Sequence, residues 1–534
     1  MYEKLSELIC SGNLEEALYE LQEEYLHIDE RTPVEAGKLC VLEASLWEAL
    51  GDSTAELDAL SKALRYDHTN YEIYYMLGLY YVDINVNKAF LCAEMALHYC
   101  DNQDDYAVIQ SLFSSAQEDK RCTVRNTSIM ILSYNDLSIM QKCLESVKKY
   151  VPSDSYEIVV VDNASTESGV REYLREEEKN LNDRFVLIEN PENAGFPAGC
   201  NIGYRNCNPD NDILFLNNDA CLTPLSLFWM KMELYDNRKV GACSALSNYA
   251  SLQNVDFNDM KAFINEKLQK FWPELSDAES EYFETVKNQI NSPDCDNLWH
   301  RYTGADAAMW AFEKYALYKG VLLGKNYVNK FRLTGFALLL SRDAINAVAD
   351  DDCIFDERFF PGYFEDDDLG IRIARAGFEQ RLCKNSFVYH NGGGGFEGHS
   401  DALERGRERF KEKWGFDVWA YCLPWEEACS EVIELAGRTN GILRVIDFTC
   451  GFGANAARIK EAVSNVYVAG VCTSPFAAGI ADDVCDDVIF GDLNLVRIPW
   501  PANSFDVAIY EKDKVCKGQI SHCLKPGGII FADE

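Results

Sequence analysis

The chain has no long apolar run. No segment of its 534 residues reaches the roughly 18–20 consecutive apolar residues that cross a bilayer, and the N-terminal stretch MYEKLSELICSGNLEE lacks the apolar core of a signal peptide. We therefore expect a cytoplasmic protein without an integral membrane segment.

Positive charge is scarce as well. The 50 lysines and arginines are outnumbered by 87 aspartates and glutamates, which leaves a formal net charge of −37. Because such a surface repels phosphate backbones and anionic lipid headgroups, nucleic acid is not expected as a main partner. An acidic substrate would need a metal ion or a local basic pocket.

Closely spaced cysteine pairs are missing too. The 20 cysteines include no C-x-x-C pair, and several stand inside apolar runs, for example Cys200, Cys207, Cys221 and Cys243. This usage predicts buried, reduced thiols in a reducing compartment and not a disulfide framework or a zinc site. The length predicts three or four domains.

Residues 1–122 show only helical periodicity. GNLEEALYEL, GDSTAELDALSKAL and the segment at 88–96 each predict the second helix of a helical hairpin, and Ala63 and Ala96 lie 33 positions apart. YYMLGLYY, at 74–81, resembles the first helix of a tetratricopeptide repeat, whose period is about 34 residues. Stacked hairpins would offer a concave surface to a peptide or partner protein, and a generic helical bundle is the alternative.

From about residue 126, short apolar runs alternate with amphipathic helices. The predicted strands are 128–134, 158–161, 185–188 and 213–216, and the predicted helices include 140–150 and 170–179. This alternation predicts an α/β fold with a mostly parallel sheet covered on both faces.

Polar residues stand where these strands are predicted to end. They are Ser133, Tyr134, Asn135, Asp162, Asn163, Asn217, Asn218 and Asp219. Ligands of parallel sheets bind at the carboxyl ends of the strands, and oxygen-bearing side chains there can bind a nucleotide or a metal ion. We therefore expect a ligand site along this edge.

Four consecutive carboxylates, Glu365 to Asp368, open an amphipathic helix within FDERFFPGYFEDDDLGIRIARAGF, and His390 follows in VYHNGGGGF. Crowded like charges can hold one group near the pKa that acid–base chemistry needs, and the histidine can reach the same site if the chain folds back. Alternatively, the run only stabilises the helix through its dipole, by roughly 0.3–1 kcal/mol per charge. Arg372 is spaced to pair with Asp368.

Eight ordered motifs between about residues 126 and 420 resemble glycosyltransferase family 2, in particular its rhamnosyltransferase-like branch. They are SYND, VVVDNAS, ENPENAGFPAGCNIGY, FLNNDA, LTGFALLLSR, FDERFFPGYFEDDDLGIRIARAGF, VYHNGGGGF and RFKEKWG. The resemblance implies a GT-A fold, a nucleotide-sugar donor, a divalent cation such as Mn²⁺ or Mg²⁺, and inversion at the anomeric carbon.

The resemblance also implies metal-binding and catalytic residues. Asp219 matches the metal ligand that closes the family's DxD-like motif, which here begins with Asn217, and His390 is expected to complete the metal site. An amide binds Mg²⁺ or Mn²⁺ more weakly than a carboxylate does. Asp366, from the family's ED motif, is expected to be the base that deprotonates the acceptor hydroxyl, with Glu365 beside it.

Donor binding is implied in the same way. Asp162 matches the aspartate that accepts a hydrogen bond from the imide N–H of uracil or thymine, which implies a UDP- or dTDP-sugar. Tyr134 and Asn135 are expected near the base and ribose, and the glycine turn at Gly195 leads into a helix that carries Asn201. The other strand-end residues expected to line the donor site are Ser133, Asn163, Asn217 and Asn218.

An insert at about residues 250–330 separates two of the motifs. Its helical period predicts a small packed subdomain, and we expect it to shape acceptor choice. Its aromatic residues include Phe271, Trp272, Trp299, Tyr302, Trp310 and Tyr315.

Beyond about residue 426, RVIDFTCGFGANAARIK, VYVAGVCTSPFAAGIADDV, IFGDLNLVRIPWPANSFDVAIY and CLKPGG resemble a class I S-adenosylmethionine (SAM)-dependent methyltransferase. The resemblance implies cofactor contacts from Asp447, Gly451, Gly453 and Asp492. However, Thr449 replaces the first glycine of the turn, Cys472 stands where the ribose-binding acid is usual, and the chain stops before the last strands of that fold. We therefore expect a degenerate or truncated domain used for packing or assembly, with SAM not expected as a cofactor.

These patterns predict a tetratricopeptide-like helical region at 1–122, a GT-A domain at 123–425 and a partial Rossmann-like methyltransferase domain at 426–534. The leading hypothesis is an inverting glycosyltransferase that moves a hexose or deoxyhexose, with rhamnose as one option, from a UDP- or dTDP-sugar to a surface polysaccharide or protein acceptor. The helical region favours a protein acceptor or partner. The alternatives are an inactive repeat-containing scaffold and a working SAM-dependent methyltransferase.

Overall fold

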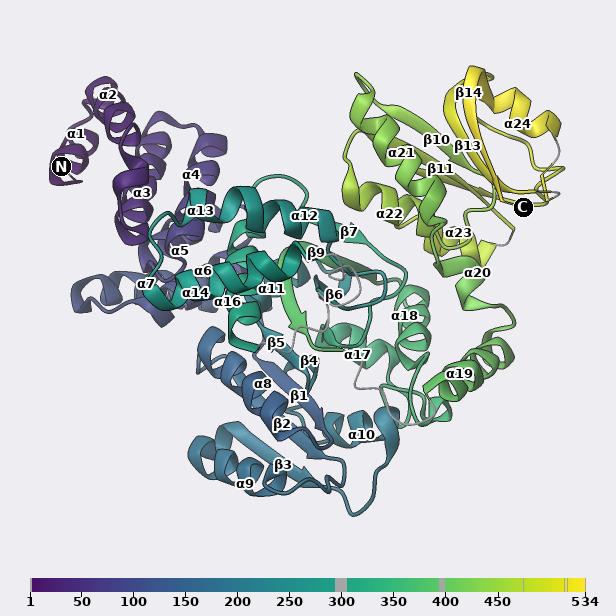
Figure 1. The fold of residues 1–534 in the computed structure, drawn as a ribbon, viewed down its shortest axis with the longest axis horizontal. Helices are drawn as coiled ribbons and strands as arrows, with labels where there is room; N and C mark the ends of the chain where they lie inside the picture. Colours follow the sequence, from purple (N-terminus) through teal and green to yellow (C-terminus); the bar gives the residue numbers. More distant parts are fainter. Residues whose placement is uncertain are drawn as a thin grey trace.

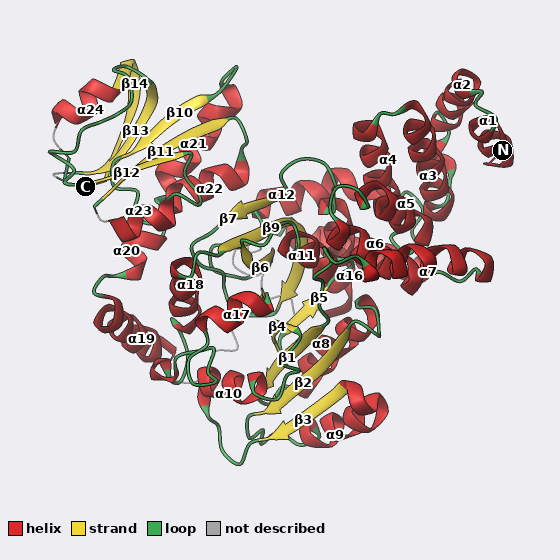
Figure 2. Ribbon diagram, turned by 180° about the vertical axis from the view of Figure 1, so that it is seen from behind, coloured by secondary structure: helices red, strands yellow, loops and turns green. Residues whose placement is uncertain are grey.

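The computed structural model describes residues 2–292, 305–392, 399–473, 475–512, 514–515 and 517–533. In chain order, a helical N-terminal region is followed by a central α/β part and a smaller C-terminal α/β part (Figures 1 and 2). Within these residues, no helix is both long enough and apolar enough to cross a membrane.

Seven α-helices form the N-terminal region. They are α1 (Tyr2–Cys10), α2 (Leu14–Tyr25), α3 (Pro33–Leu50), α4 (Ser53–Tyr66), α5 (Tyr71–Tyr81), α6 (Val86–Tyr99) and α7 (Gln103–Glu118), with a 3₁₀ turn, η1 (Ile28–Glu30). Polar residues cap the free N–H groups where helices begin. Thr32 and Glu35 form a capping box at α3, and Asp52 and Asn70 cap α4 and α5.

Helices α1–α2, α3–α4 and α5–α6 pack as successive pairs joined by short loops. The three segments expected to be second helices of hairpins correspond to α2, α4 and α6. Ala63 in α4 and Ala96 in α6 are both fully buried, because small side chains let neighbouring helices pack closely.

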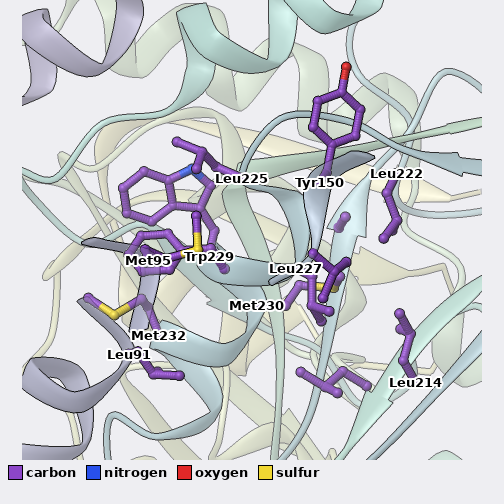
Figure 3. Packing of buried hydrophobic residues seen from close by; sticks show 14 of the residues in the cluster. Leu91, Met95, Tyr150, Leu214, Leu222, Leu225, Leu227, Trp229, Met230 and Met232 are labelled. Atoms are coloured by element: carbon purple, nitrogen blue, oxygen red, sulfur yellow. The ribbon is translucent and has the colours of Figure 1, made fainter. Parts of the chain in front are cut away.

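The helical region shares its apolar core with the central part of the chain (Figure 3). Leu91 of α6 belongs to the same buried cluster as Trp229 of α11 (Ser226–Leu234), and the ring of Tyr74 meets the ring of Phe228 edge-on at 5.8 Å. This face of the helical region is therefore covered by the central part and is not free to bind another protein.

Nine strands form the central sheet, in the order β3-β2-β1-β4-β8-β6-β9-β5, with β7 paired to β9. They are β1 (Thr127–Ser133), β2 (Tyr156–Asp162), β3 (Phe185–Glu189), β4 (Asp212–Asn217), β5 (Ala220–Leu222), β6 (Val240–Leu246), β7 (Tyr327–Asn329), β8 (Ala337–Leu340) and β9 (Glu379–His390). The four strands predicted from apolar runs are confirmed as β1 to β4, which run parallel. Strand β8 is antiparallel to both β4 and β6.

Helices pack around the sheet and continue the chain beyond it. Besides α11 they are α8 (Leu137–Tyr150), α9 (Val170–Leu181), α10 (Gly195–Tyr204), α12 (Phe257–Ala262), α13 (Leu268–Phe271), α14 (Asp277–Ile290), α16 (Ala305–Lys319), α17 (Arg342–Val348), α18 (Glu365–Arg375), α19 (His399–Trp414) and α20 (Val418–Cys422). Two 3₁₀ turns, η2 (Asn182–Arg184) and η5 (Glu357–Phe359), and a π-helical segment, η3 (Phe263–Lys267), complete this part.

The insert is helical, as its periodicity predicted. Helices α12, α13, α14 and α16 bury Phe263, Trp272 and Tyr315, and the Tyr315 hydroxyl donates to Asp259 Oδ2 at 2.7 Å. These contacts define a small packed subdomain beside β9. Trp299 and Tyr302, two of the aromatic residues singled out in the sequence, lie outside the described residues.

The C-terminal part contains a five-stranded, all-parallel sheet in the order β12-β11-β10-β13-β14. Its elements are α21 (Glu426–Arg438), β10 (Leu443–Asp447), α22 (Ala454–Ala462), β11 (Val466–Cys472), α23 (Pro475–Ala481), β12 (Asp487–Phe490), β13 (Phe505–Glu511), α24 (Lys517–Cys523) and β14 (Leu524–Asp533). Separate apolar clusters cover its two faces.

Candidate active site

The carboxyl ends of β1, β2 and β4 lie side by side. In the parallel register Ser133 stands opposite Asp162, and Leu132 stands opposite Asn217. The polar residues that follow these strands therefore meet at one edge of the sheet, as the strand-end pattern predicted.

Asp219 and His390 come together next to this edge. Strand β5 pairs with the end of β9, which brings His390 Nε2 within 3.2 Å of Asp219 Oδ1. Burial alone would lower the pKa of His390, but the Asp219 carboxylate outweighs it and raises that pKa above its usual value. Burial would raise the pKa of Asp219, and the imidazole instead holds it below the usual value. Each side chain thus stabilises the charged form of the other.

The imidazole of His390 is oriented by its surroundings. Its Nδ1 lies 2.5 Å from the carbonyl oxygen of Tyr249, and since a carbonyl can only accept, Nδ1 carries a proton. The ring stacks on Phe336 with 5.1 Å between centroids, and Asn248 exchanges two hydrogen bonds of 2.8 Å with the His390 backbone. The Nε2 atom is therefore the one that faces Asp219.

The Asp219–His390 pair has the chemistry of a partial site for a divalent cation. Carboxylate oxygen and imidazole nitrogen are common ligands, and a metal-binding histidine usually donates its other ring N–H to a carbonyl or carboxylate. Asn217 borders the pair, with Nδ2 3.4 Å from His390 Nε2. In the described part of the chain, no group of three or more His, Cys, Asp or Glu side chains could hold a metal alone.

The four carboxylates at the start of α18 have different surroundings. Asp368 is fully buried and accepts hydrogen bonds from Arg372 Nε and Trp414 Nε1, both at 2.9 Å, while Lys413 Nζ lies 2.5 Å away. The pair expected between Asp368 and Arg372 is confirmed. With three donors around it, Asp368 anchors the helix and has no free face for an acceptor.

Asp367 and Glu365 are also buried. Asp367 pairs with Arg332 at 2.8 Å, yet burial prevails and raises the pKa of Asp367 to about 7. Burial and then the negative charge of Asp366 raise the pKa of Glu365 well above its usual value. Glu365, expected beside the base, is thus a buried carboxyl whose charged form is disfavoured.

Asp366 faces the turn that precedes β8. Its Oδ2 accepts a hydrogen bond from the backbone N–H of Gly335 at 3.3 Å. The next residue, Phe336, carries the ring on which His390 stacks, and its carbonyl accepts a hydrogen bond from Asn217 N at 2.9 Å. Asp366 therefore borders the same region as the Asp219–His390 pair and the end of β4.

Asp162 is covered. Its side chain is 0% exposed, with Oδ2 accepting from Arg171 Nε at 2.7 Å and Oδ1 accepting from Ser165 N at 3.2 Å. The side chain of Arg171 is 36% exposed. A pyrimidine base could reach the Asp162 carboxylate, as the resemblance implies, only if Arg171 moved.

Two residues expected among the donor ligands shape the site from beneath. Asn163 Oδ1 accepts from Asn190 Nδ2 at 3.0 Å and so holds the loop before α10. Asn201 is fully buried, and its Oδ1 accepts at 3.0 Å from the N–H groups of Ile354 and Phe355 while its Nδ2 donates to the Phe355 carbonyl. Their amide groups are occupied by these loops, so they are not available to contact a ligand directly.

The remaining strand-end residues differ in access. Ser133 Oγ is buried and finds no hydrogen-bond partner among the residues that the structure describes. Asn135 Oδ1 accepts from the N–H of Thr166 at 2.7 Å and so joins the first two strand-end loops. Tyr134 is exposed and Asn218 is partly exposed. Of this group, Tyr134 and Asn218 are open to a ligand.

Gly195 opens α10 in a left-handed backbone conformation, with φ +75°. A Cβ atom at this position would lie 2.7 Å from the ring of Phe360, so only glycine allows the approach. The next residue, Phe196, donates its N–H to the Pro361 carbonyl at 2.8 Å. The glycine turn thus fixes the segment that leads into α18.

Sequence reasoning missed Arg171, Arg332, Tyr249 and Phe336. Phe336 stands inside the LTGFALLLSR motif, and its place there was the one available signal. Tyr249 acts through its carbonyl oxygen, which leaves no trace in the side-chain pattern. The two arginines matter because they pair with the buried carboxylates Asp162 and Asp367, and these contacts are visible only in the structure.

Residues 128–292 match the family model described as Glycosyl transferase family 2, which identifies this segment as a glycosyltransferase family 2 domain. The sheet and its strand-end site occupy this segment and the residues that follow it. The curated proteins include no match to the chain.

Three solved structures are similar to the chain at low identity. GalNAc-T7 with UDP, GalNAc and Mn²⁺ is 13% identical over 57% of this chain and 50% of that chain, with a TM-score of 0.37. The mannosyltransferase PcManGT from Pyrobaculum calidifontis, in complex with GDP-Man and Mn²⁺, is 15% identical over 74% and 85%, with a TM-score of 0.33. S. aureus TarS 1-349 is 13% identical over 63% and 81%, with a TM-score of 0.30. The chain thus spans half the length of GalNAc-T7.

Proposed function

We propose that the chain is a metal-dependent inverting glycosyltransferase that moves a hexose or deoxyhexose from a UDP- or dTDP-sugar to a surface polysaccharide or protein acceptor. One observation carries the proposal. The Asp219–His390 pair and Asp366 flank the same two residues, Gly335 and Phe336, at the carboxyl end of β4. A carboxylate–imidazole pair suited to a metal ion and a candidate base therefore border one site.

The residues of the chain divide the work as follows. Asp366 accepts the proton of the acceptor hydroxyl as that oxygen attacks the anomeric carbon from the face opposite the nucleoside diphosphate. Asp219 and His390 would hold a divalent cation, which would supply positive charge to stabilise the departing diphosphate. Asp368, Asp367 and the arginines paired with them hold the start of α18 in place.

Donor recognition is assigned to the ends of β1 and β2. Tyr134 is exposed there, and Arg171 covers Asp162, so a uracil or thymine ring would meet the guanidinium of Arg171 first. The Ser133 hydroxyl is buried at these strand ends without a partner among the described residues. Residues 1–122 are proposed as a tetratricopeptide-like partner-binding region, within a division into 1–122, 123–425 and 426–534.

The test is release of nucleoside diphosphate. The protein is incubated with Mn²⁺ and a panel of UDP-, dTDP- and GDP-sugars, with and without a cell extract as a source of acceptors. Release from a UDP- or dTDP-sugar that requires Mn²⁺ and increases with extract supports the proposal. No release and no calorimetric binding of any donor would favour the alternative of an inactive repeat-containing scaffold.

A further inference from the structure

The C-terminal sheet has a glycine turn where a methyltransferase would hold SAM, and another segment of the chain lies against it. The turn follows β10 and includes Gly451, where an added Cβ would lie 2.9 Å from both the Cα and the carbonyl oxygen of Tyr421. The N–H of Phe452 donates to that same carbonyl at 3.1 Å, and the Tyr421 hydroxyl lies 3.5 Å from Thr473 Oγ1, just after β11. Tyr421 thus spans the two strand ends between which the cofactor would bind.

The residues expected to contact SAM make contacts within the protein instead. Asp447 is buried, and its two carboxylate oxygens accept from Thr449 N at 3.0 Å and Asn455 Nδ2 at 2.9 Å. In place of the ribose-binding acid, the thiol of Cys472 lies 3.1 Å from the thiol of Cys450. These groups do not fit the cofactor.

The two remaining candidates are also in structural roles. A Cβ at Gly453 would lie 2.2 Å from Val484 Cγ2, so Gly453 allows the close approach of α22 to the end of α23. Asp492 is exposed, and its Oδ1 caps the N–H of Asn494 at 2.9 Å.

An aromatic seam joins this glycine turn to the transferase part of the chain. The seam consists of Phe410, Trp414, Phe416, Tyr421, Phe452 and Phe476. Phe416 lies at its centre, with its ring centroid 5.2 Å from both Tyr421 and Phe452 and 6.3 Å from Phe476. Edge-to-face and tilted contacts of this kind stabilise aromatic clusters.

The transferase end of the seam contacts helix α18. Trp414 Nε1 donates to the buried Asp368 at 2.9 Å. The guanidinium of Arg375, in the last turn of α18, lies 5.5 Å from the Trp414 ring and 5.6 Å from the Phe476 ring, a cation–π arrangement that bridges both ends of the seam.

A second set of contacts also connects the C-terminal part with the start of α18. Phe452, next to Gly451, has its ring 5.7 Å from that of Phe331. The following residue, Arg332, pairs with Asp367 at 2.8 Å. Lys330, on the other side, pairs with Glu461 of α22 at 2.9 Å. Two buried carboxylates that follow Asp366 are therefore linked to the C-terminal part. Asp367 is linked through Arg332 and the Phe331–Phe452 contact, and Asp368 through Trp414 and Arg375, which reaches Phe476.

We infer that the C-terminal part of the chain does not bind SAM. Instead, its glycine turn packs against the aromatic seam, and the seam positions α18 and hence Asp366. Trp414 is the positioning residue nearest to the acidic run. The inference rests on the proposed function only where it concerns Asp366, because the packing of the glycine turn against the seam and the lack of SAM binding can be tested without sugar transfer.

The first experiment titrates SAM into the full chain by calorimetry and follows amide hydrogen exchange with and without 1 mM SAM, about a thousandfold above a micromolar dissociation constant. No heat and unchanged exchange in β10, β11 and α18 are expected. Micromolar binding, or slower exchange at the glycine turn on addition of SAM, would overturn the inference even if the protein transfers sugar.

The second experiment compares Gly451→Ala with Gly527→Ala. Both glycines have left-handed backbones, with φ +53° and +80°, but a Cβ at Gly527 meets nothing within 4 Å. The backbone strain is therefore matched, and only Gly451→Ala pushes the seam away. Faster amide exchange over residues 364–376 in Gly451→Ala and not in Gly527→Ala is the expected result. Equal exchange in the two variants would contradict the claim that the packing of the glycine turn against the seam positions α18.

Trp414→Phe supplies a readout that a purely structural role would not move, and it decides the question if Gly451→Ala does not fold. It keeps an aromatic ring and removes the N–H that reaches Asp368, together with one ring of the indole. We expect UDP binding in the presence of Mn²⁺ to stay within about twofold of wild type, while the rate of UDP release falls by about tenfold or more, since small misplacements of a catalytic group are costly. An unchanged rate, or a parallel loss of UDP affinity and rate, would overturn the positioning role.

Discussion

His390 and Asp219 face each other through one pair of atoms, Nε2 and Oδ1, which lie 3.2 Å apart. The other ring nitrogen of His390 already donates to the Tyr249 carbonyl. When the imidazole is neutral, its free lone pair therefore points at the carboxylate, and a cation can replace the shared proton between them. This relationship separates His390 from a histidine that only fills space in the core.

Replacing His390 by glutamine tests the metal assignment. Gln keeps the size and polarity of the side chain but loses the imidazole nitrogen, so Mn²⁺-dependent UDP affinity should fall by about 10- to 100-fold or more. Calorimetry of UDP with and without Mn²⁺ measures the change. His522→Gln, at an exposed position in the C-terminal part, is the control. Equal Mn²⁺ dependence in the two variants would rule out His390 as a ligand.

Asp366→Asn should remove the base and leave the donor site intact. We expect the rate of sugar transfer to fall by about 10²- to 10⁴-fold, the usual contribution of a general base, while the affinity for UDP with Mn²⁺ stays close to that of wild type. Parallel loss of binding would move Asp366 into the metal site instead. Glu365→Gln is the companion variant, and it should retain most activity because Glu365 is buried and Asp366 is the proposed base.

Asp368→Asn should affect stability before chemistry. The buried Asp368 carboxylate balances Arg372 and Lys413, and removing its charge takes away the carboxylate that pairs with Arg372, while Lys413 keeps its contact with Asp356. Breaking such a buried pair costs about 3 kcal/mol, which urea unfolding would detect. Glu434→Gln is a matched control, because Glu434 and Arg438 form an i,i+4 pair that is more than half exposed and is worth less than about 1 kcal/mol. Similar losses in both variants would show that Asp368 is no more important than a surface pair.

The sequence predicted the sheet better than it predicted the site. Apolar runs of strand length are a local signal, so β1 to β4 and the polar residues at their ends were found from the pattern alone. Whether a polar side chain is open to a ligand depends on contacts that are distant in sequence. The side-chain oxygen of Asn201 accepts hydrogen bonds from the backbone of residues 354 and 355, more than 150 positions away.

The C-terminal part shows the same limit more sharply. Its motifs predicted a sheet with a glycine turn after the first strand, and the turn is present after β10. What occupies the turn is Tyr421, which belongs to the short helix before this part and resembles no cofactor-related motif. Only the packing of α20 against the turn shows that the turn is already filled.

Asp447 supplies a prediction on pH that is independent of sugar transfer. Burial raises the pKa of this carboxyl to about 6, although hydrogen bonds from Asn455 and Thr449 oppose the shift. In the unfolded chain the pKa is about 3.9. Between these values the folded protein holds the proton more tightly, so its stability falls as pH rises from about 4 to about 6 and is constant above that window.

The difference should amount to about 2–3 kcal/mol between pH 4 and pH 7, since one pKa unit corresponds to about 1.4 kcal/mol. Many carboxylates titrate in this range, so the informative quantity is wild type minus Asp447→Asn, measured by urea unfolding monitored through exchange of the β10 amides. The Asn variant carries a fixed cost but cannot ionise, so this difference should shrink as pH rises. Asp492→Asn, on the exposed surface, is the control. If the difference for Asp447→Asn changes with pH no more than that for Asp492→Asn, the pKa of Asp447 is not raised in the folded protein.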